Sequence, residues 1–205
     1  IVFVDGYFPA KQREAIEMDI IGIVKSHQAG IKEDFMIIRK GETKDYELIY
    51  SLVQQAFGSA EHSDGNEQDL VNSLRKSDAF IPELSLVAEM GGRIVGHIMF
   101  TKAMVGNKAV LALAPLSVLP EYQKKGIGTA LIKEGHRIAG GLGYGYSVVL
   151  GSEKYYPQMG YLPADKFGIK PSFEVPKENF MACRLKEDVT SVGGIMKYAK
   201  EFGIS

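Results

Sequence analysis

From residue 36 onward, the spacing of apolar residues predicts short strands that alternate with helices. Residues 36–39 have the composition of a strand, and Thr43 is a candidate N-cap for a first helix that ends at Gly58. A polar loop over residues 59–65 separates this helix from a second one, expected over residues 66–76. The apolar positions of the two helices recur three or four residues apart: Leu48, Ile49, Leu52, Val53 and Ala56 in the first, and Leu70, Val71 and Leu74 in the second.

A β-hairpin is expected over residues 84–104, because two strand-like runs flank a turn at Gly91 and Gly92. The next strand, over residues 109–118, contains Pro115. Proline has no N–H to donate to a neighbouring strand, so we expect this strand to be bulged or unpaired there. The rest of the pattern predicts a turn, a helix, two strands and a C-terminal helix, over residues 120–126, 127–139, 147–150, 181–185 and 195–201.

Residues 1–35 have a different pattern from the rest of the chain. Apolar residues recur at helical spacing between Ala15 and Val24, with charges of both signs at the other positions, up to a stop near Gly30. This predicts an amphipathic helix in an appendage, followed by one domain over residues 36–205. The mixed charges favour docking of the helix on its own domain over dimerisation or binding to a membrane surface; a homodimer is kept as an alternative.

Composition narrows the class of protein. The 205 residues carry 24 Lys plus Arg and 25 Asp plus Glu, a formal net charge of −1, with the basic residues scattered singly or in pairs. Such a chain lacks the broad positive surface that a nucleic acid needs, so nucleic acid is not expected as a partner. The longest apolar run, over residues 109–119, is shorter than the ~18 residues of a membrane span, and we expect neither a membrane segment nor an export signal.

The cysteine and histidine content gives two further expectations. Cys183 is the one cysteine in the sequence, so it cannot form a disulfide within the chain, and a reducing, cytoplasmic compartment is expected. The four histidines lie too far apart for any known metal-ligand spacing, so no metal is expected.

Residues 116–131 carry the clearest indication of chemistry. A strand leads into a tight turn with Lys124, Lys125, Gly126 and Gly128, and a helix follows at once. Backbone N–H groups at the start of such a helix point into one concavity that suits phosphate. A solvated turn without a ligand is the alternative, since short motifs match by chance. Two other phosphate motifs fail here: a leucine stands in place of the third glycine of a dinucleotide fingerprint, and the chain has no nucleotide P-loop.

Residues 123–128, Gln-Lys-Lys-Gly-Ile-Gly, resemble the Gln-x-x-Gly-x-Gly loop of the GNAT acetyltransferase superfamily, which cradles the pyrophosphate of acetyl-CoA. Residues 155–161, Tyr-Tyr-Pro-Gln-Met-Gly-Tyr, resemble the Tyr-x-x-x-Gly-Phe element of that family, with Tyr161 in place of Phe. The resemblance extends from Met36 to the C-terminus, and it is to a YhbS-like subgroup of predicted N-acetyltransferases. Further matching runs lie at residues 84–89, 94–98, 113–118 and 149–151.

The resemblance implies an α/β fold of GNAT type: a mixed, mostly antiparallel sheet with helices on both faces and one parallel strand pair that splays apart. It places the pantetheine arm of acetyl-CoA in the gap beyond Pro115, bound to backbone groups freed near Leu116 and Val118. The proline is then a functional feature of its strand. The residues expected to bind the cofactor are Leu116, Ser117, Val118, Gln123, Lys124, Lys125, Gly126, Ile127, Gly128 and Thr129.

Tyr156 stands four residues before Gly160, where family members often place a tyrosine near the CoA sulfur. A phenol with a pKa of about 10 matches the basicity of a leaving thiolate, so the resemblance implies that Tyr156 protonates the thiolate. Tyr155 is expected to face away and to pack against the core or the cofactor. Taken alone, Tyr156 is read more simply as an aromatic side chain packed on the sheet, with its hydroxyl hydrogen-bonded.

The base that deprotonates an attacking ammonium is harder to assign, because the strand over residues 109–118 contains no carboxylate. Glu67, at the start of the second helix, is the first choice, since substrate loops in this superfamily come from that region. Cys183 is expected to be a small buried hydrophobe, because no activating histidine or cation lies near it in the sequence. Other candidates for the base are Glu83, Glu89, Glu153 and His97.

The resulting prediction is direct transfer of acetyl from acetyl-CoA to a primary amine in a ternary complex. The acceptor is left open among small amines, amino acids, antibiotics and protein amines. A non-catalytic acyl-CoA-binding or sensing module is the alternative, favoured by the missing strand carboxylate. A generic phosphate- or nucleotide-binding domain is a third, weakened by the two failed motifs.

Overall fold

The computed structural model describes residues 35–58 and 65–204. Contacts within the chain divide it into Ile1–Phe35 and Met36–Ser205, and the second unit carries every element described below. The amphipathic helix expected before Gly30 lies outside the described residues, so the appendage stays a prediction.

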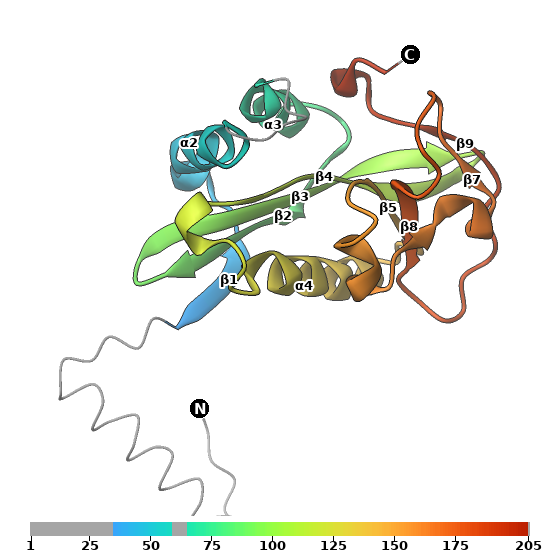
Figure 1. Ribbon diagram of the computed structural model, residues 1–205. Coiled ribbons are helices and arrows are strands. Elements are labelled where there is room, and N and C mark those ends of the chain that lie inside the picture. Colours follow the sequence, from blue (N-terminus) through green and yellow to red (C-terminus); the bar gives the residue numbers. More distant parts are fainter. Residues whose placement is uncertain (1–34, 59–64, 205) are drawn as a thin grey trace, which may run out of the picture. The chain divides into compact units, whose positions relative to one another are not determined.

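The second unit is built around one sheet, whose strands lie in the order β1-β2-β3-β4-β5-β8-β6 (Figure 1). The short strand β9 pairs with the end of β3 and with β7. Paired strands run antiparallel except for β4 with β5 and β7 with β9, which confirms the predicted mixed, mostly antiparallel sheet. The strands are β1 (Met36–Lys40), β2 (Phe80–Met90), β3 (Arg93–Val105), β4 (Lys108–Val118), β5 (Tyr146–Leu150), β6 (Leu162–Pro163), β7 (Ile169–Lys170), β8 (Phe180–Arg184) and β9 (Gly194–Lys197).

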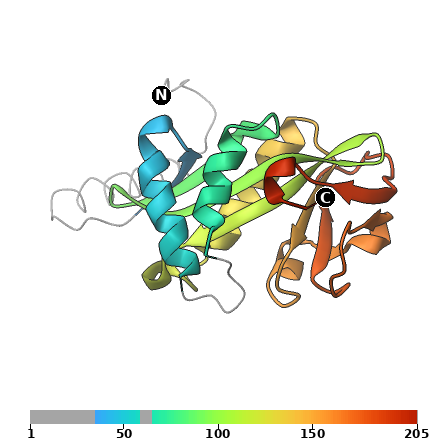
Figure 2. The same ribbon diagram turned by 90° about the horizontal axis from the view of Figure 1, so that it is seen from above.

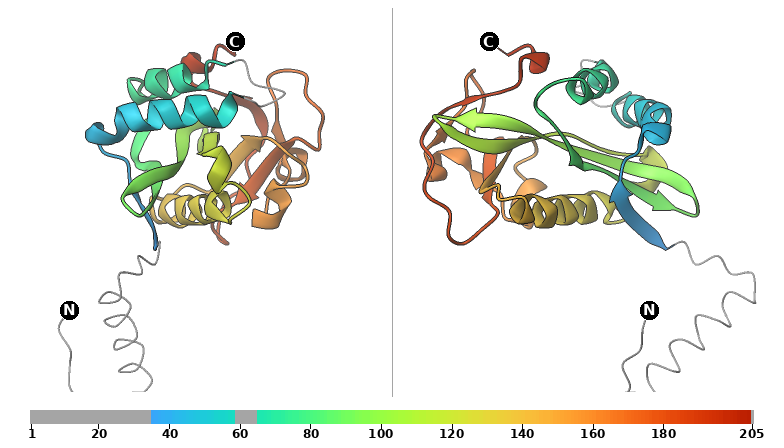
Figure 3. Two further views of the ribbon diagram at one scale, coloured as in Figure 1. Left: turned by 60° about the vertical axis from the view of Figure 1, so that its left-hand side comes forward. Right: turned by 180° about the vertical axis from the view of Figure 1, so that it is seen from behind.

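Helices cover both faces of this sheet (Figures 1 and 3). α2 (Tyr46–Phe57) and α3 (Glu67–Arg75) lie side by side on one face, with η5 (Lys200–Phe202) next to α3 (Figure 2). α4 (Ile127–Gly141) lies on the opposite face. The remaining 3₁₀ turns are η1 (Thr43–Asp45), η2 (Pro120–Tyr122), η3 (Tyr156–Met159) and η4 (Ala164–Phe167). None of the helices in the described part of the chain is long and apolar enough to cross a membrane.

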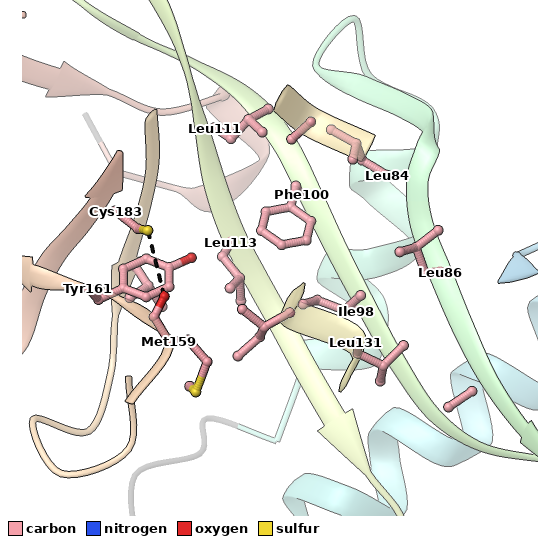
Figure 4. Close-up of a cluster of buried hydrophobic side chains, with 14 of the residues drawn as sticks. Leu84, Leu86, Ile98, Phe100, Leu111, Leu113, Leu131, Met159, Tyr161 and Cys183 are labelled. Atoms are coloured by element: carbon pink, nitrogen blue, oxygen red, sulfur yellow. Dashed lines mark hydrogen bonds between the residues drawn. The ribbon is translucent and has the colours of Figure 1, made fainter. Parts of the chain in front are cut away.

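Each face of the sheet has its own apolar core, because successive side chains of a strand point to opposite faces. Gly135 of α4 sits where the ring of Phe100 leaves no room for a Cβ atom, so α4 can approach the sheet closely. The core under α4 includes Leu84, Leu86, Ile98, Phe100, Leu111, Leu113 and Leu131 (Figure 4). The core under α2 and α3 includes Ile49, Leu52, Val53, Val71, Leu74, Val87 and Met99.

The start of α2 differs from its prediction. Thr43 is not the N-cap: it begins η1, and Asp45 is the N-cap of α2. The buried Asp45 carboxylate accepts two hydrogen bonds from the Arg39 guanidinium (2.6 and 3.0 Å) and one from the backbone N–H of Glu42 (2.8 Å). The bonds from Arg39, above all, lower the pKa of Asp45. An ion pair that links β1 to the turn therefore sets where the helix begins.

The helix predicted over residues 195–201 is wrong. The chain there forms β9 and then the single turn η5. Val105 pairs with Met196, whose side chain is fully buried, while Ile195 is exposed. Exposure alternates along β9 as it does in a strand packed on one face, so pairing with the end of β3 overrides the local helical pattern.

β4 is bulged at Pro115, as predicted. Ile98 of β3 pairs with Leu116 and Phe100 pairs with Leu113, so the one residue between them on β3 faces two residues on β4, Ala114 and Pro115. The parallel pairing of β4 with β5 is limited to two positions, Leu111 with Ser147 and Ala112 with Val148. β4 continues for six residues past the last of these positions, so the two strands separate at the bulge.

A fully buried histidine lies in the sheet under α2 and α3. His97 of β3 is 0% exposed, and its Nε2 lies 3.2 Å from the Ser85 hydroxyl of β2. Its Nδ1 has no hydrogen-bond partner. Burial, reinforced by the nearby Arg75 guanidinium, lowers the pKa of His97 to about 3. His97 is therefore neutral in the folded protein at neutral pH.

His97 should make the stability of this fold depend on pH. Its pKa is lower in the folded chain than in the unfolded chain, where it titrates near about 6.5. The contribution of His97 to the free energy of unfolding is therefore fully present above that pH. It decreases as the pH falls towards 3, by up to about 1.4 kcal/mol per pH unit. Urea unfolding from about pH 7.5 down to about pH 5 measures this slope.

The matched variant is His97→Gln, which keeps a polar side chain but removes the titration. We expect lower stability at neutral pH and a shallower loss on acidification. Part of the slope should remain, because burial also lowers the pKa of His136, to about 4. Equal slopes for the two proteins would contradict the assignment.

Candidate active site

The tight turn after β4 opens α4 with an unusual backbone. Lys124 and Gly126 both have positive φ, +61° and +82°, and Gly126 is the N-cap of α4. The first bond of the helix runs from the Ala130 N–H to the Gly126 carbonyl (3.0 Å), so the N–H groups of residues 127–129 have no acceptor within the helix. The Gln123 side chain donates to the carbonyl of Val118 (3.1 Å) and ties the turn to the end of β4. The result is a set of free donors with the positive end of a helix dipole behind them.

A cavity of about 390 Å³, here called the loop cavity, lies against this turn. Eight of the ten residues predicted to bind the cofactor line it. Ser117 and Lys125 do not: Ser117 is 2% exposed and sits opposite His97 in the sheet, and Lys125 lies over the Tyr122 ring (5.1 Å). The lining residues are Leu116, Val118, Tyr122, Gln123, Lys124, Gly126, Ile127, Gly128, Thr129 and Tyr155.

Two glycines of the turn have different surroundings. A Cβ atom on Gly126 would meet nothing within 4 Å, so the space beside it is open. A Cβ atom on Gly128 would lie 2.5 Å from the Tyr155 hydroxyl, so this glycine makes room for the tyrosine. Tyr155 therefore reaches the N-terminus of α4 and lines the loop cavity. Tyr155 also packs against the core under α4, so both roles predicted for it stay open; its proximity to Gly128 has no counterpart in the sequence pattern.

Tyr156 occupies the first position of η3, after β5 has ended. Its ring packs on Gly151 and stands edge-on to Tyr155 (5.2 Å between centroids) and to Tyr161 (5.5 Å). Burial, and secondarily the neighbouring Tyr155, raises the pKa of the Tyr156 hydroxyl above its ordinary value. That hydroxyl makes no hydrogen bond to a described residue and does not line the loop cavity. The hydroxyl is thus protonated at neutral pH, on a ring whose position is set by its neighbours.

None of the candidate bases lines the loop cavity. His97 is fully buried, and Glu89 is bound to Arg39 (3.0 Å). Glu153 accepts a hydrogen bond from Asn179 (3.1 Å). Glu83 is exposed on β2. Glu67 is the first residue of α3, half-buried, and α3 lies on the face of the sheet opposite α4.

Cys183 of β8 is 7% exposed and packs in the core under α4, as predicted for a small buried hydrophobe. Its thiol lies 3.7 Å from the carbonyl oxygen of Met159 (Figure 4). Burial raises its pKa to about 11, so the nucleophilic thiolate is disfavoured. In the described part of the chain, no three His, Cys, Asp or Glu side chains gather closely enough to hold a metal ion.

A bulged strand that separates from its parallel neighbour and delivers a glycine turn to a helix N-terminus defines the acyl-CoA N-acyltransferase architecture. The family model "Acetyltransferase (GNAT) family" matches residues 46–161. The chain belongs to the GNAT family of acetyltransferases.

Two similar proteins of Escherichia coli K12 are described as uncharacterized N-acetyltransferases. YjhQ is 35% identical over 162 residues, which covers 77% of this chain and 84% of YjhQ. YhbS is 29% identical over 171 residues, which covers 82% of this chain and 98% of YhbS. The likeness thus includes nearly the whole length of YhbS.

Two solved structures are similar in fold and carry the cofactor. The 1.55 Å crystal structure of Escherichia coli YhbS in complex with CoA matches with a TM-score of 0.75 and 26% identity, over 83% of this chain and 93% of that one. A GNAT family acetyltransferase of Brucella melitensis in complex with acetyl-CoA matches with a TM-score of 0.69 and 31% identity, over 83% of this chain and 99% of that one. The predicted fold class is therefore confirmed.

Gly126→Val should abolish CoA binding if the pyrophosphate lies in the open space beside Gly126. A β-branched side chain at positive φ also costs about 1–2 kcal/mol of stability, so a control must carry the same strain. Gly143 provides it, with φ +92° and nothing within 4 Å of a Cβ atom, beyond the far end of α4. Isothermal titration with CoA should show loss of binding for Gly126→Val and unchanged affinity for Gly143→Val. If Gly126→Val binds CoA as tightly as the wild-type protein does, the pyrophosphate does not bind at this turn.

Proposed function

We propose that this protein transfers the acetyl group of acetyl-CoA to a primary amine by direct attack in a ternary complex. The observation that carries the proposal is the loop cavity at the end of β4, where free N–H groups at a helix N-terminus adjoin the point at which β4 has left β5. The N–H groups suit a pyrophosphate. The separation of β4 from β5 leaves unpaired peptide groups that an extended pantetheine arm can bind.

In this proposal each part of acetyl-CoA has its own place. The pyrophosphate accepts hydrogen bonds from the N–H groups of residues 127–129, with Lys124 adding positive charge. The pantetheine arm runs along β4 past Leu116 and Val118, which line the same cavity. The thioester then lies at the bulge, where backbone N–H groups polarise its carbonyl.

The chemistry needs three proton transfers: two from the acceptor nitrogen and one to the departing sulfur. The acceptor reaches the active site as an ammonium with a pKa of about 10.4 and must lose a proton before its nitrogen attacks the thioester carbon. A C–N bond forms, the nitrogen of the tetrahedral intermediate releases a second proton to water, the C–S bond breaks as the intermediate collapses, and a thiolate leaves. Tyr156 donates its hydroxyl proton to that thiolate. Burial keeps the phenol protonated before this step, but it also makes Tyr156 a weaker acid than a phenol of ordinary pKa. Positioning of the two reactants supplies most of the remaining rate acceleration.

Glu67 is proposed as the group that takes the proton from the ammonium, directly or through water. If the cofactor occupies the α4 side of β4, the acceptor approaches from the face that carries α2 and α3. Glu67 begins α3 on that face.

A non-catalytic acyl-CoA-binding module is the second candidate. The observation that favours it is that no carboxylate lines the loop cavity. The two functions separate in one experiment: release of free thiol from acetyl-CoA in the presence of a panel of polyamines, amino acids, aminoglycosides and peptides. Acetyl transfer to any member supports the enzyme, whereas tight acetyl-CoA binding with no transfer to any member supports the module.

Tyr156→Phe should lower kcat by ~10²- to 10⁴-fold, the usual range for loss of a general acid. The ring and its packing on Gly151 are retained, so the affinity for acetyl-CoA should change little. The adjacent Tyr155→Phe is the contrast, because its hydroxyl lies at the helix N-terminus; there we expect weaker cofactor binding with kcat kept within a few-fold. Steady-state kinetics with the best acceptor of the panel measure both. Equal kcat for the wild-type protein and Tyr156→Phe would show that Tyr156 is not the general acid and that its ring only packs against its neighbours.

Glu67→Gln should lower kcat/KM by about 10²-fold at neutral pH if Glu67 is the base. It should also remove the acidic limb of the pH–rate profile, since that limb reports protonation of the base. Glu187→Gln, at an exposed position after β8, is the control and should leave the profile unchanged. A profile that keeps its acidic limb in Glu67→Gln would rule this residue out.

A further inference from the structure

Tyr161 differs from the family element by one hydroxyl group, and the structure gives that hydroxyl two partners. It lies 2.9 Å from His136 Nε2 and 2.7 Å from Ser147 Oγ. His136 belongs to α4 and Ser147 to β5, so one oxygen atom joins the helix and the strand to the segment that follows η3. The ring itself is 0% exposed and lies beside Met159 and Cys183 in the core under α4 (Figure 4).

The two partners are themselves held in place. Ser147 is 0% exposed, on the strand position that pairs with Leu111 of β4. The His136 ring also lies against the rings of Phe100 and Tyr161, tilted by 56° and 47°, with centroids 6.0 and 5.3 Å away. Burial of such groups is tolerated when they are hydrogen-bonded, so the hydroxyl of Tyr161 satisfies polar groups that a phenylalanine would leave unpaired.

The ring of Tyr161 also forms one wall of the Tyr156 site. The two rings stand edge-on, 5.5 Å apart at 75°, and Gly151 and Tyr155 form the other walls. Between the two tyrosines the chain makes the single turn η3, closed by Gly160 at φ +86°. A 3₁₀ turn of this length has few hydrogen bonds of its own, so its position depends on what its ends are attached to.

We propose that Tyr161 is a positioning residue for acetyl transfer: its hydroxyl, held between His136 and Ser147, fixes the ring against which Tyr156 stands. The inference rests on the proposed role of Tyr156. Without the hydroxyl the ring would remain in the core but lose the two bonds that fix its depth. A general acid displaced by about 1 Å from its leaving group loses much of its effect.

Tyr161→Phe, which restores the residue of the family element, tests this through a double-mutant cycle. We expect kcat to fall about 10-fold with the affinity for acetyl-CoA unchanged. The same substitution in a chain that already carries Tyr156→Phe should have no further effect, because it acts through that hydroxyl. Tyr146→Phe is the matched control, since Tyr146 is equally buried but packs in a different core of the same sheet. Unchanged kcat, or equal losses in both backgrounds, overturns the proposal.

Hydrogen exchange supplies a readout that needs no acceptor. The amides of Tyr156 and Gly160, bonded to Ser152 (3.2 Å) and Pro157 (3.1 Å), report on η3. They should exchange faster in Tyr161→Phe, and to a lesser degree in Ser147→Ala, while α4 amides keep their rates. Ser147→Ala also serves if Tyr161→Phe fails to fold.

The two proposals fail in different ways. If the wild-type protein acetylates no acceptor of the panel, the proposed function is wrong. Hydrogen exchange of the Tyr156 and Gly160 amides then tests, without kinetics, whether Tyr161 holds η3. Unchanged exchange in both variants overturns the inference even if the wild-type protein is fully active.

Discussion

The pairing of β4 with β5 stops after Ala112 and Val148, and the rest of the site depends on that interruption. Beyond the bulge at Ala114 and Pro115, β4 keeps β3 on one side, but along the edge that faced β5 the described residues provide no strand partner. Peptide groups left unpaired in this way need another partner, which an extended ligand can supply. The same strand leads directly into the turn that begins α4, so the gap and the helix N-terminus adjoin each other.

Close packing of glycine against tyrosine then gives the site its shape. The hydroxyl of Tyr155 lies where Gly128 has no side chain, and the ring of Tyr156 lies on Gly151. Both contacts bring η3 against the end of β5 and the start of α4, and Tyr161 adds a hydrogen-bonded anchor on the other side. Aromatic side chains with few rotamers and large contact areas suit this purpose, because they hold a short turn that has little structure of its own.

The elements that could be predicted were those with a local cause. The hairpin follows from strand propensity around Gly91 and Gly92, and the start of α4 follows from Gly126, which adopts the positive φ that glycine permits. The bulge follows from the missing N–H of Pro115. The errors had distant causes. The start of α2 depends on an ion pair from β1. Residues 194–197 form β9 because they pair with β3, some ninety residues earlier, and with β7, about 25 residues earlier.

The same distinction between local and distant causes applies to the candidate site. The sequence by itself determined the family and the glycine turn that opens α4, because Gln123, Gly126 and Gly128 act through their own backbone and their immediate neighbours. Only the tertiary structure decided which of the adjacent tyrosines lines the loop cavity and which is buried beside it, and that the hydroxyl of Tyr161 is shared by α4 and β5. Those relations join residues 14 to 39 positions apart, whose proximity is fixed by how the sheet and α4 pack; no local pattern of residues encodes a contact of that kind.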